Sequence, residues 1–147
     1  MKIGFVGLGN MGTGMANNIL KNINNKSDLF VYTRTLDKIK NFTERGASGS
    51  SSIEEITNSV DVLLTCLPNV ETSKELFMAK GGIFEYANSK QVLVDHSTVD
   101  VKTSKECFDS ASSKGLNFLD APISGGPGGA ADGTLTIMVG GKESSFN

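Results

Sequence analysis

The sequence predicts an α/β fold, a doubly wound and mainly parallel sheet with helices on both faces, from three observations. Short apolar stretches rich in β-branched residues alternate with amphipathic stretches along the chain, which is typical of a parallel sheet. A glycine-rich turn joins the first apolar stretch to the first amphipathic one. The length of 147 residues fits one domain with a core of its own.

Six stretches are expected to be strands because they are short and apolar and because turn residues bound them. In chain order they are Lys2–Gly7, Leu29–Thr33, Val60–Leu67, Gln91–Asp95, Leu116–Ala121 and Thr134–Val139. Pro68 ends the third of them, since proline has no amide hydrogen to donate to a sheet.

The stretches between these strands are expected to be helices. The first, Asn10–Asn22, carries apolar side chains at helical spacing, and the second runs from a cap at Thr35 to about Arg45. Three more begin at capping boxes, in which a Ser or Thr is followed three residues later by Glu. These boxes are Ser51-Ser-Ile-Glu54, Thr72-Ser-Lys-Glu75 before a stop at Gly81-Gly82, and Thr103-Ser-Lys-Glu106 before a stop near Gly115.

The composition argues against several classes of protein. A net charge of −2 does not favour binding to phosphates of nucleic acid, so no nucleic-acid partner is expected. No apolar run reaches the ~18 residues of a membrane span, and Met1 leads directly into a strand, so we expect a cytoplasmic protein without membrane contact. Cys66, Cys107 and the single histidine, His96, have no metal-ligand spacing. A reduced cysteine pair and no metal site are therefore expected.

Glycine is the informative excess, since much of it lies in two short segments. The first, Gly7-Leu-Gly-Asn-Met-Gly12, is a G-x-G-x-x-G motif between a strand and a helix, which is the context of Rossmann-type dinucleotide binding. Gly7 would make the tight turn, Gly9 would let the backbone approach a pyrophosphate, and Gly12 would let helix and strand pack closely. The alternative is a tight turn without a ligand. The residues predicted to bind the cofactor here are Gly7, Leu8, Gly9, Asn10, Met11 and Gly12.

The end of the second strand distinguishes NAD from NADP. In NAD sites an acidic residue usually lies there and holds the ribose 2′-hydroxyl. This chain has Thr33-Arg34-Thr35 instead, with Lys38 one turn further on. A guanidinium can bind a 2′-phosphate through charge-assisted hydrogen bonds, so NADP is predicted as the preferred cofactor and NAD as the second choice. The alternative is that Arg34 is an ordinary solvated charge.

The second glycine-rich segment runs from Asp120-Ala-Pro-Ile-Ser-Gly-Gly126 into a stretch that ends at Gly141. We expect a wide loop, whose backbone amides beside the Ser124 hydroxyl would suit a carboxylate or an oxyanion. A plain loop without a ligand is an equally good interpretation of these residues.

Four motifs in this order resemble the β-hydroxyacid dehydrogenases, a family that includes 3-hydroxyisobutyrate dehydrogenase and is related to 6-phosphogluconate dehydrogenase. The motifs are Phe5–Gly12 with Met15-Ala-Asn-Asn18, Cys66-Leu-Pro68, Asp95-His-Ser-Thr-Val99, and Asp120–Gly126 with Gly133–Gly141. The resemblance covers nearly the whole chain. It implies reversible oxidation of a 3-hydroxy acid by NAD(P), with a small carboxylic acid as substrate.

The resemblance also implies roles for single residues. Leu67 and Pro68 would lie against the cofactor ribose, and Thr98 would lie near the nicotinamide. The Ser124 hydroxyl and the amides of Gly125 and Gly126 would hold the substrate.

The resemblance further places a catalytic lysine, helped by an asparagine, beyond Asn147, so no catalytic residue is expected within this chain. Residues 1–141 would form the cofactor-binding domain. Residues 142–147 would begin the connection to an all-helical domain, which builds the homodimer or tetramer of the full-length family. The chain is then a fragment that binds cofactor with little turnover, and a lost presequence would make it mitochondrial. The alternative is a non-catalytic NADP(H)-binding or sensing module.

Four side chains near these motifs are expected to be structural. His96 is interpreted as a structural or solvent-facing residue instead of an acid–base catalyst. Cys66 is interpreted as a buried, apolar cysteine instead of a reactive one. The Met11 and Met15 side chains are expected to pack in the core, with the Met11 backbone facing the ligand.

Overall fold

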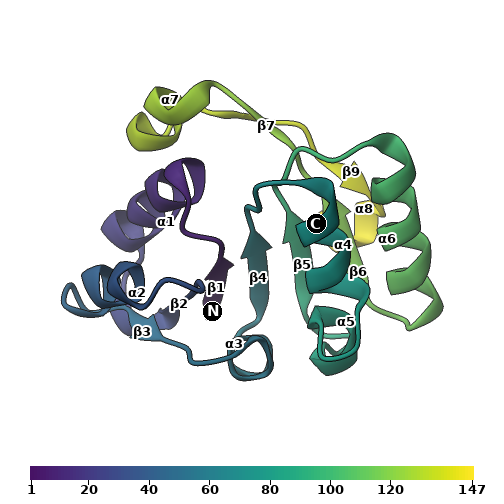
Figure 1. Ribbon diagram of the computed structural model, residues 1–147, viewed down its shortest axis with the longest axis horizontal. Helices are drawn as coiled ribbons and strands as arrows, with labels where there is room; N and C mark the ends of the chain where they lie inside the picture. The colour runs from purple at the N-terminus through teal and green to yellow at the C-terminus, as the bar shows by residue number, and fades with distance from the viewer.

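The computed structural model describes residues 1–147 and contains a seven-stranded sheet of order β3-β2-β1-β4-β5-β6-β9. Every pairing from β3 to β6 is parallel, and only β9 runs antiparallel to its neighbour β6. The parallel part has the 3-2-1-4-5-6 strand order of doubly wound dinucleotide-binding folds. The predicted Rossmann-type α/β fold is therefore confirmed (Figure 1).

The main sheet confirms five of the six predicted strands, each slightly shorter than expected. Its members are β1 (Ile3–Val6), β2 (Leu29–Tyr32), β3 (Ser48–Gly49), β4 (Val62–Thr65), β5 (Val92–Asp95), β6 (Asn117–Asp120) and β9 (Gly140–Gly141). The edge strand β3 was not predicted, because two residues are too short to show a period of two.

The sixth predicted strand, Thr134–Val139, is confirmed only in part and does not join the main sheet. Only β8 (Thr136–Ile137) forms there, and it pairs antiparallel with β7 (Ile123–Ser124) in a separate two-stranded ribbon. The apolar side chains of Ile137, Met138 and Val139 are 42–50% exposed, so an apolar run that resembles a core strand lies at the surface. The chain rejoins the main sheet only at β9.

The helices occupy the stretches between strands, as predicted. They are α1 (Asn10–Asn22), the 3-10 helix η1 (Lys26–Asp28), α2 (Leu36–Thr43), α3 (Ile53–Ser59), α4 (Val70–Met78), α5 (Ile83–Tyr86), α6 (Val101–Ser113), α7 (Gly126–Asp132) and α8 (Glu143–Phe146). The predicted bounds of α1 are confirmed, whereas α2 ends two residues early. No helix combines the length and the apolar character that crossing a membrane requires.

The start of α3 shows a capping box that is displaced by one residue from the predicted one. Ser52, not Ser51, is the N-cap, and its side chain accepts a hydrogen bond from the Glu55 amide. The Glu55 carboxylate in turn accepts from the amide and hydroxyl of Ser51. Thr35 holds the N-cap position of α2 as predicted, but its side chain makes no capping hydrogen bond.

The predicted capping boxes of α4 and α6 are wrong, because each helix begins three residues earlier. Asn69 caps α4 and accepts from the Thr72 amide, and Asp100 caps α6 and accepts from the Thr103 amide. Asn and Asp are stronger N-caps than Thr. The two threonines are thus capped residues within the first turn instead of caps.

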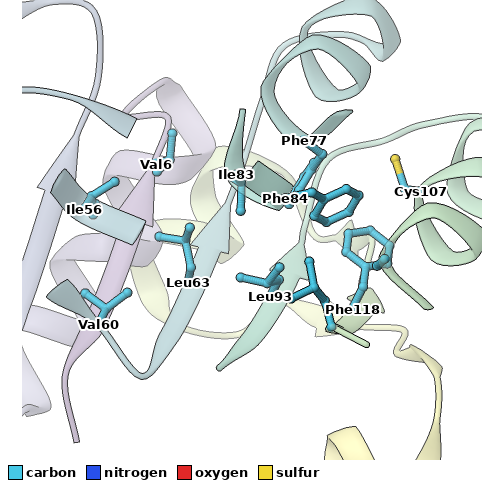
Figure 2. Packing of buried hydrophobic residues seen from close by; sticks show 12 residues of the cluster. Val6, Ile56, Val60, Leu63, Phe77, Ile83, Phe84, Leu93, Cys107 and Phe118 are labelled. Carbon is cyan, nitrogen blue, oxygen red and sulfur yellow. The ribbon is translucent and has the colours of Figure 1, made fainter. Parts of the chain in front are cut away.

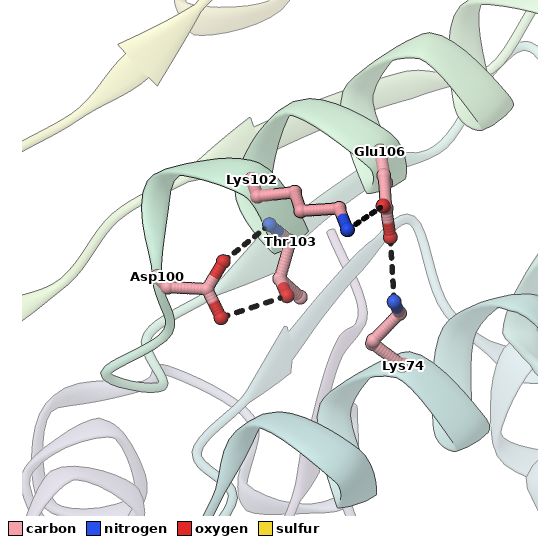
Figure 3. A network of polar contacts seen from close by, with 5 residues as sticks. All are labelled: Lys74, Asp100, Lys102, Thr103 and Glu106. Atoms are coloured by element: carbon pink, nitrogen blue, oxygen red, sulfur yellow. Dashed lines mark hydrogen bonds and ion pairs between the residues drawn. The ribbon is translucent and has the colours of Figure 1, made fainter.

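The side chains that begin α6 also connect it to α4. Figure 3 shows Asp100 bonded to Thr103, and Glu106 between Lys102 and Lys74. The Lys74–Glu106 pair, at 2.6 Å, joins the two helices. Both side chains are more than a third exposed, so this pair aligns the helices while contributing little stability.

Two apolar clusters cover opposite faces of the sheet. Neighbouring β1 side chains separate into them, since Phe5 packs with α1 and α2, and Val6 packs with the cluster of α3 to α6. In the cluster that contains Val6, the ring centres of Phe77, Phe84 and Phe118 lie 5.3–5.8 Å from one another (Figure 2). Because strand side chains alternate, this separation fixes the register of the sheet.

The second glycine-rich segment is not the wide loop that was predicted, because α7 forms within it. Pro127 lies in the first turn of α7, where its missing amide hydrogen costs nothing. Gly133 ends the helix in the left-handed conformation, at φ +73°. These two residues provide a start and a stop that make a short helix out of a glycine-rich stretch.

The helix α7 lies against α1, away from the sheet (Figure 1). The Asn18 side-chain amide donates to the carbonyls of Gly14, Ala130 and Ala131 at 2.7–3.2 Å. A Cβ on Gly14 would lie 2.8 Å from the Ala130 carbonyl carbon. A glycine is therefore required on α1 for α7 to pack this closely.

Candidate functional site

A cavity of about 620 Å³ lies at the carboxyl ends of β1, β2 and β4. Its volume is in the range of small-molecule sites. The chain leaves β1 toward β2 on one side and reaches β4 on the other, and ligands of doubly wound folds bind at this switch in strand order. Twelve of the predicted cofactor residues line the cavity, namely Gly7, Leu8, Gly9, Asn10, Met11, Gly12, Thr33, Arg34, Thr35, Lys38, Leu67 and Pro68.

The three glycines of the first motif differ in what surrounds them. A Cβ on Gly7 would lie 2.2 Å from the Cys66 carbonyl oxygen, and Gly7 has φ +96°. A Cβ on Gly12 would lie 1.9 Å from the Gly7 carbonyl oxygen. A Cβ on Gly9 would meet nothing within 4 Å. The turn and the close packing thus require Gly7 and Gly12, whereas Gly9 borders open space.

The amino end of α1 is suited to an anion. Gly9 is its N-cap and offers no side-chain acceptor, and its first turn contains no acidic residue. The first-turn amides of a helix have no acceptor within the helix and form its positive end. A phosphate at this end would receive hydrogen bonds from the backbone of a 13-residue helix.

The glycine loop is fixed from outside by two side chains. The Lys38 ammonium donates to the Leu8 carbonyl at 2.9 Å, and the Thr13 hydroxyl donates to the same oxygen at 3.0 Å. The Leu8 side chain is buried in the core of that face. Lys38 is therefore part of the structure that holds the loop, as well as a cation on the cavity wall.

The charged side chains that line the cavity are mainly basic. They are Arg34, Lys38 and Lys80, with Glu75 as the one acidic member. Arg34 is exposed and makes no ion pair or side-chain hydrogen bond in the structure. Its guanidinium is therefore free to bind a phosphate at the end of β2.

One wall of the cavity was not predicted from the sequence. Thr72, Glu75 and Leu76 of α4 line it, together with the segment Ala79–Gly82 and Ile53 of α3. The capping box expected at Thr72-Ser-Lys-Glu75 indicated a helix start and no site, because the position of these residues depends on how α4 packs after β4. The Pro68 stop and the Gly81-Gly82 pair were the only signals that the chain turns here.

The segment after β4 places a thiol and two apolar residues on the wall. Cys66 is half-buried, and burial raises the pKa of its thiol to about 11. At neutral pH the thiol is protonated and a poor nucleophile, in agreement with the structural role expected for it. The Leu67 amide donates to the Ser97 hydroxyl oxygen at 2.9 Å.

Four predicted site residues lie outside this cavity. Thr98 is exposed in the segment after β5. Ser124, Gly125 and Gly126 are exposed where β7 leads into α7. The structure does not bring these four residues into the cavity, so their roles stay predictions.

Two basic residues near the sheet have structural surroundings. His96 is buried, its Nδ1 lies 2.8 Å from the Ala121 carbonyl oxygen, and burial lowers the pKa of its imidazole. Lys142 is the N-cap residue of α8, and its ammonium lies 5.9 Å from the centre of the Phe108 ring.

The two methionines of α1 differ in their surroundings. The Met15 side chain packs in the core as expected, whereas Met11 borders the cavity.

Comparison with known proteins identifies relatives along the full chain. A family model described as the NAD binding domain of 6-phosphogluconate dehydrogenase matches residues 2–147. A probable mitochondrial 3-hydroxyisobutyrate dehydrogenase of Dictyostelium discoideum is 39% identical over 145 residues, which are 99% of this chain and 44% of that protein. The chain thus spans a little under half the length of this curated relative.

Solved structures give the same assignment at the level of the fold. A Mycobacterium tuberculosis 3-hydroxyisobutyrate dehydrogenase solved with L-serine is 32% identical, with a TM-score of 0.87 over 99% of this chain and 48% of that one. Psf3, solved in complex with NADP+ and 2-OPP, is 26% identical, with a TM-score of 0.91 over 98% of this chain and 50% of that one.

Proposed function

Because this chain belongs to the family of NAD binding domains of 6-phosphogluconate dehydrogenase, we propose that its cavity binds a nicotinamide dinucleotide, with NADP preferred to NAD. The observation that carries the proposal is the position of the glycine loop. The uncapped end of α1 and the open side of Gly9 border the same cavity as Arg34. One end of this cavity suits a pyrophosphate, and the other suits a 2′-phosphate.

In this proposal, different residues of the chain bind different parts of the dinucleotide. The first-turn amides of α1 hold the pyrophosphate. Arg34 binds the 2′-phosphate, and Lys38 holds the Leu8 carbonyl while adding positive charge to the wall. Leu67 and Pro68 contact the ribose from the β4 side. Bound there, the nicotinamide would supply hydride transfer.

The whole protein, in this proposal, is an oxidoreductase that interconverts a 3-hydroxy acid such as 3-hydroxyisobutyrate and its semialdehyde. The names of the relatives support this substrate class. Thr98 would lie near the nicotinamide, and Ser124 with the amides of Gly125 and Gly126 would hold the substrate carboxylate or hydroxyl. No residue of this chain is assigned a catalytic role. Residues 1–141 would form the cofactor-binding domain.

Calorimetric titration with NADPH and NADH tests the cofactor assignment. Arg34→Asp should weaken NADPH binding by about one to two orders of magnitude, because a charge-assisted hydrogen bond contributes about 1.5–3 kcal/mol. Its affinity for NADH should stay near that of the wild type. Lys40→Asp makes the same charge change on α2 at a residue outside the cavity, and both affinities should be retained. An equal loss for both cofactors in Arg34→Asp would refute the 2′-phosphate contact.

A further inference from the structure

A buried carboxylate behind the cavity has no role in the proposed function. Asp95, the last residue of β5, is 2% exposed and forms no ion pair with a basic side chain. Its Oδ1 accepts from the Thr65 hydroxyl at 2.8 Å and from the Ser97 amide at 2.9 Å, and its Oδ2 accepts from the Ser73 hydroxyl at 2.6 Å. Burying a carboxylate is costly unless donors surround it, so this arrangement is a specific one.

The donors connect Asp95 to the cavity through Ser97. The Ser97 hydroxyl donates its single hydrogen to Asp95, and its oxygen accepts from the Leu67 amide. The Cys66 amide makes the last sheet-like bond of this strand, to the Val6 carbonyl. The residue after Leu67 is Pro68, which has no amide hydrogen. The Leu67 amide is thus the only backbone donor within the Leu67–Pro68 segment.

A second connection runs from Asp95 to α4. Ser73 is fully buried on the inner face of α4, and its helix neighbours Thr72 and Leu76 line the cavity. The hydrogen bond from Ser73 to Oδ2 therefore holds the helix that forms the wall missed from the sequence. One carboxylate reaches two parts of the cavity, each through a single serine.

We propose that Asp95 and Ser97 are positioning residues for the cofactor cavity, with Asp95 orienting the Ser97 hydroxyl and Ser97 fixing the Leu67–Pro68 segment. This inference rests on the proposed function, since the cavity is taken to be the dinucleotide site. Neither residue touches the cavity itself. Their effect on binding is transmitted through the Leu67 amide.

Two matched substitutions separate positioning from general stabilisation. Ser97→Ala and Thr65→Val each remove one hydroxyl donor to Asp95 Oδ1, but only Ser97→Ala releases the Leu67 amide. Thr65 keeps its place because β4 pairs with β1 on one side and β5 on the other. We expect Ser97→Ala to raise the Kd for NADPH about tenfold, as loss of a hydrogen bond of ordinary strength would. Thr65→Val should stay within about twofold of the wild type.

Hydrogen exchange of the Leu67 amide gives a direct readout, measured without cofactor. It should be protected in the wild type and in Thr65→Val, and exchange at least about tenfold faster in Ser97→Ala. Asp95→Asn keeps an acceptor for Ser97 and offers Ser73 a donor in place of an acceptor. It should therefore keep the Leu67 protection and bind NADPH within about threefold of the wild type.

Three results would overturn the inference. They are an unprotected Leu67 amide in the wild type, equal effects of Ser97→Ala and Thr65→Val on NADPH binding, and loss of Leu67 protection in Asp95→Asn with its fold intact. If Ser97→Ala does not fold, wild-type exchange and Asp95→Asn still decide. Absence of NADPH binding by the wild type would refute the proposed function, and Leu67 exchange would still report on the Asp95–Ser97 connection.

Discussion

The two glycine-rich segments of this chain have similar composition and opposite structural roles. In the first, Gly7 and Gly12 are needed because a Cβ at either position would collide with backbone oxygen. In the second, a Cβ on Gly128 would meet nothing within 4 Å, and the seven residues of α7 lie in the middle of the segment. Glycine content therefore marks two different things here, a crowded turn under a cavity and a short, exposed helix outside it.

The difference follows from what each segment packs against. The first lies between β1 and α1, where the backbones of the Gly7 turn, Cys66 and the helix approach one another. The second leaves the sheet after β6 and touches the rest of the molecule mainly where Ala130 meets Gly14. Its exposed amides and the Ser124 hydroxyl lie on a ribbon outside the cavity.

The largest effect is expected from a glycine-to-alanine exchange at Gly12. Its Cβ would lie 1.9 Å from the Gly7 carbonyl oxygen, so the turn must open or the helix must move. We expect unfolding free energy to fall by about 3 kcal/mol or more, near the upper end for overpacking, as measured by chemical denaturation. The matched exchange Gly128→Ala, inside α7, should raise stability by about 0.5–1 kcal/mol. Similar losses in both variants would remove the distinction between the segments.

Gly9 sharpens the comparison, since it belongs to the crowded motif but borders open space. Its φ of −75° is accessible to alanine, so Gly9→Ala should change the unfolding free energy by less than about 1 kcal/mol. The added methyl group would occupy the approach to the pyrophosphate, and NADPH affinity should fall about tenfold or more. Calorimetry and denaturation on the same samples would check this, and undiminished affinity would contradict it.

The thiol beside the first segment reports on the cavity wall. With its pKa raised from 9.0 to about 11, Cys66 should be alkylated at pH 8 about a hundredfold more slowly than an ordinary thiol. The rate should continue to rise up to about pH 11, and bound NADPH should slow it. The Cys107→Ser variant leaves Cys66 as the only thiol, so the measured alkylation rate belongs to Cys66 alone. Cys107 itself should contribute little in the wild type, because burial raises the pKa of its thiol to about 12. Rapid alkylation at pH 7 would contradict this account.

The smallest effect is expected near the start of the second segment, where the buried His96 imidazole lies against the Ala121 carbonyl. Because the folded pKa is lowered below 6.5, the unfolded chain binds the proton more readily. The stability contribution is therefore complete above about pH 6.5 and decreases as pH falls below it. Unfolding free energy measured between pH 5 and 8 should show this slope in the wild type. His96→Asn should lack that part of the slope.

The sequence predicted the fold and most of one wall of the site, because both depend on local signals. The order of strands and helices and the bounds of α1 follow from periodicity. Ten of the cavity residues follow from the glycine motif and the end of the second strand, whereas Leu67 and Pro68 were implied by the family resemblance. Two helix starts were predicted wrongly, because Thr72 and Thr103 each begin a capping-box pattern while Asn69 and Asp100 are the N-caps of α4 and α6.

Local signals could not place the parts that depend on packing between distant residues. The α4 wall depends on the Ser73–Asp95 hydrogen bond, whose partners are 22 residues apart, and the Leu67 amide is bonded to Ser97, 30 residues further along the chain. Likewise, α7 is held by Asn18 of α1, more than a hundred residues away. The apolar run at Ile137–Val139 looks like a core strand, but its side chains are 42–50% exposed.

The sequence by itself therefore determined that a strand, a glycine turn and a helix would follow one another at the end of the chain's first strand, since these features involve neighbouring residues. Only the tertiary structure decided which further side chains line the cavity beside that turn and that the second glycine segment lies outside it. The physical reason is that burial and hydrogen-bond partners of a group such as Asp95 are set by elements that meet only after the sheet has assembled.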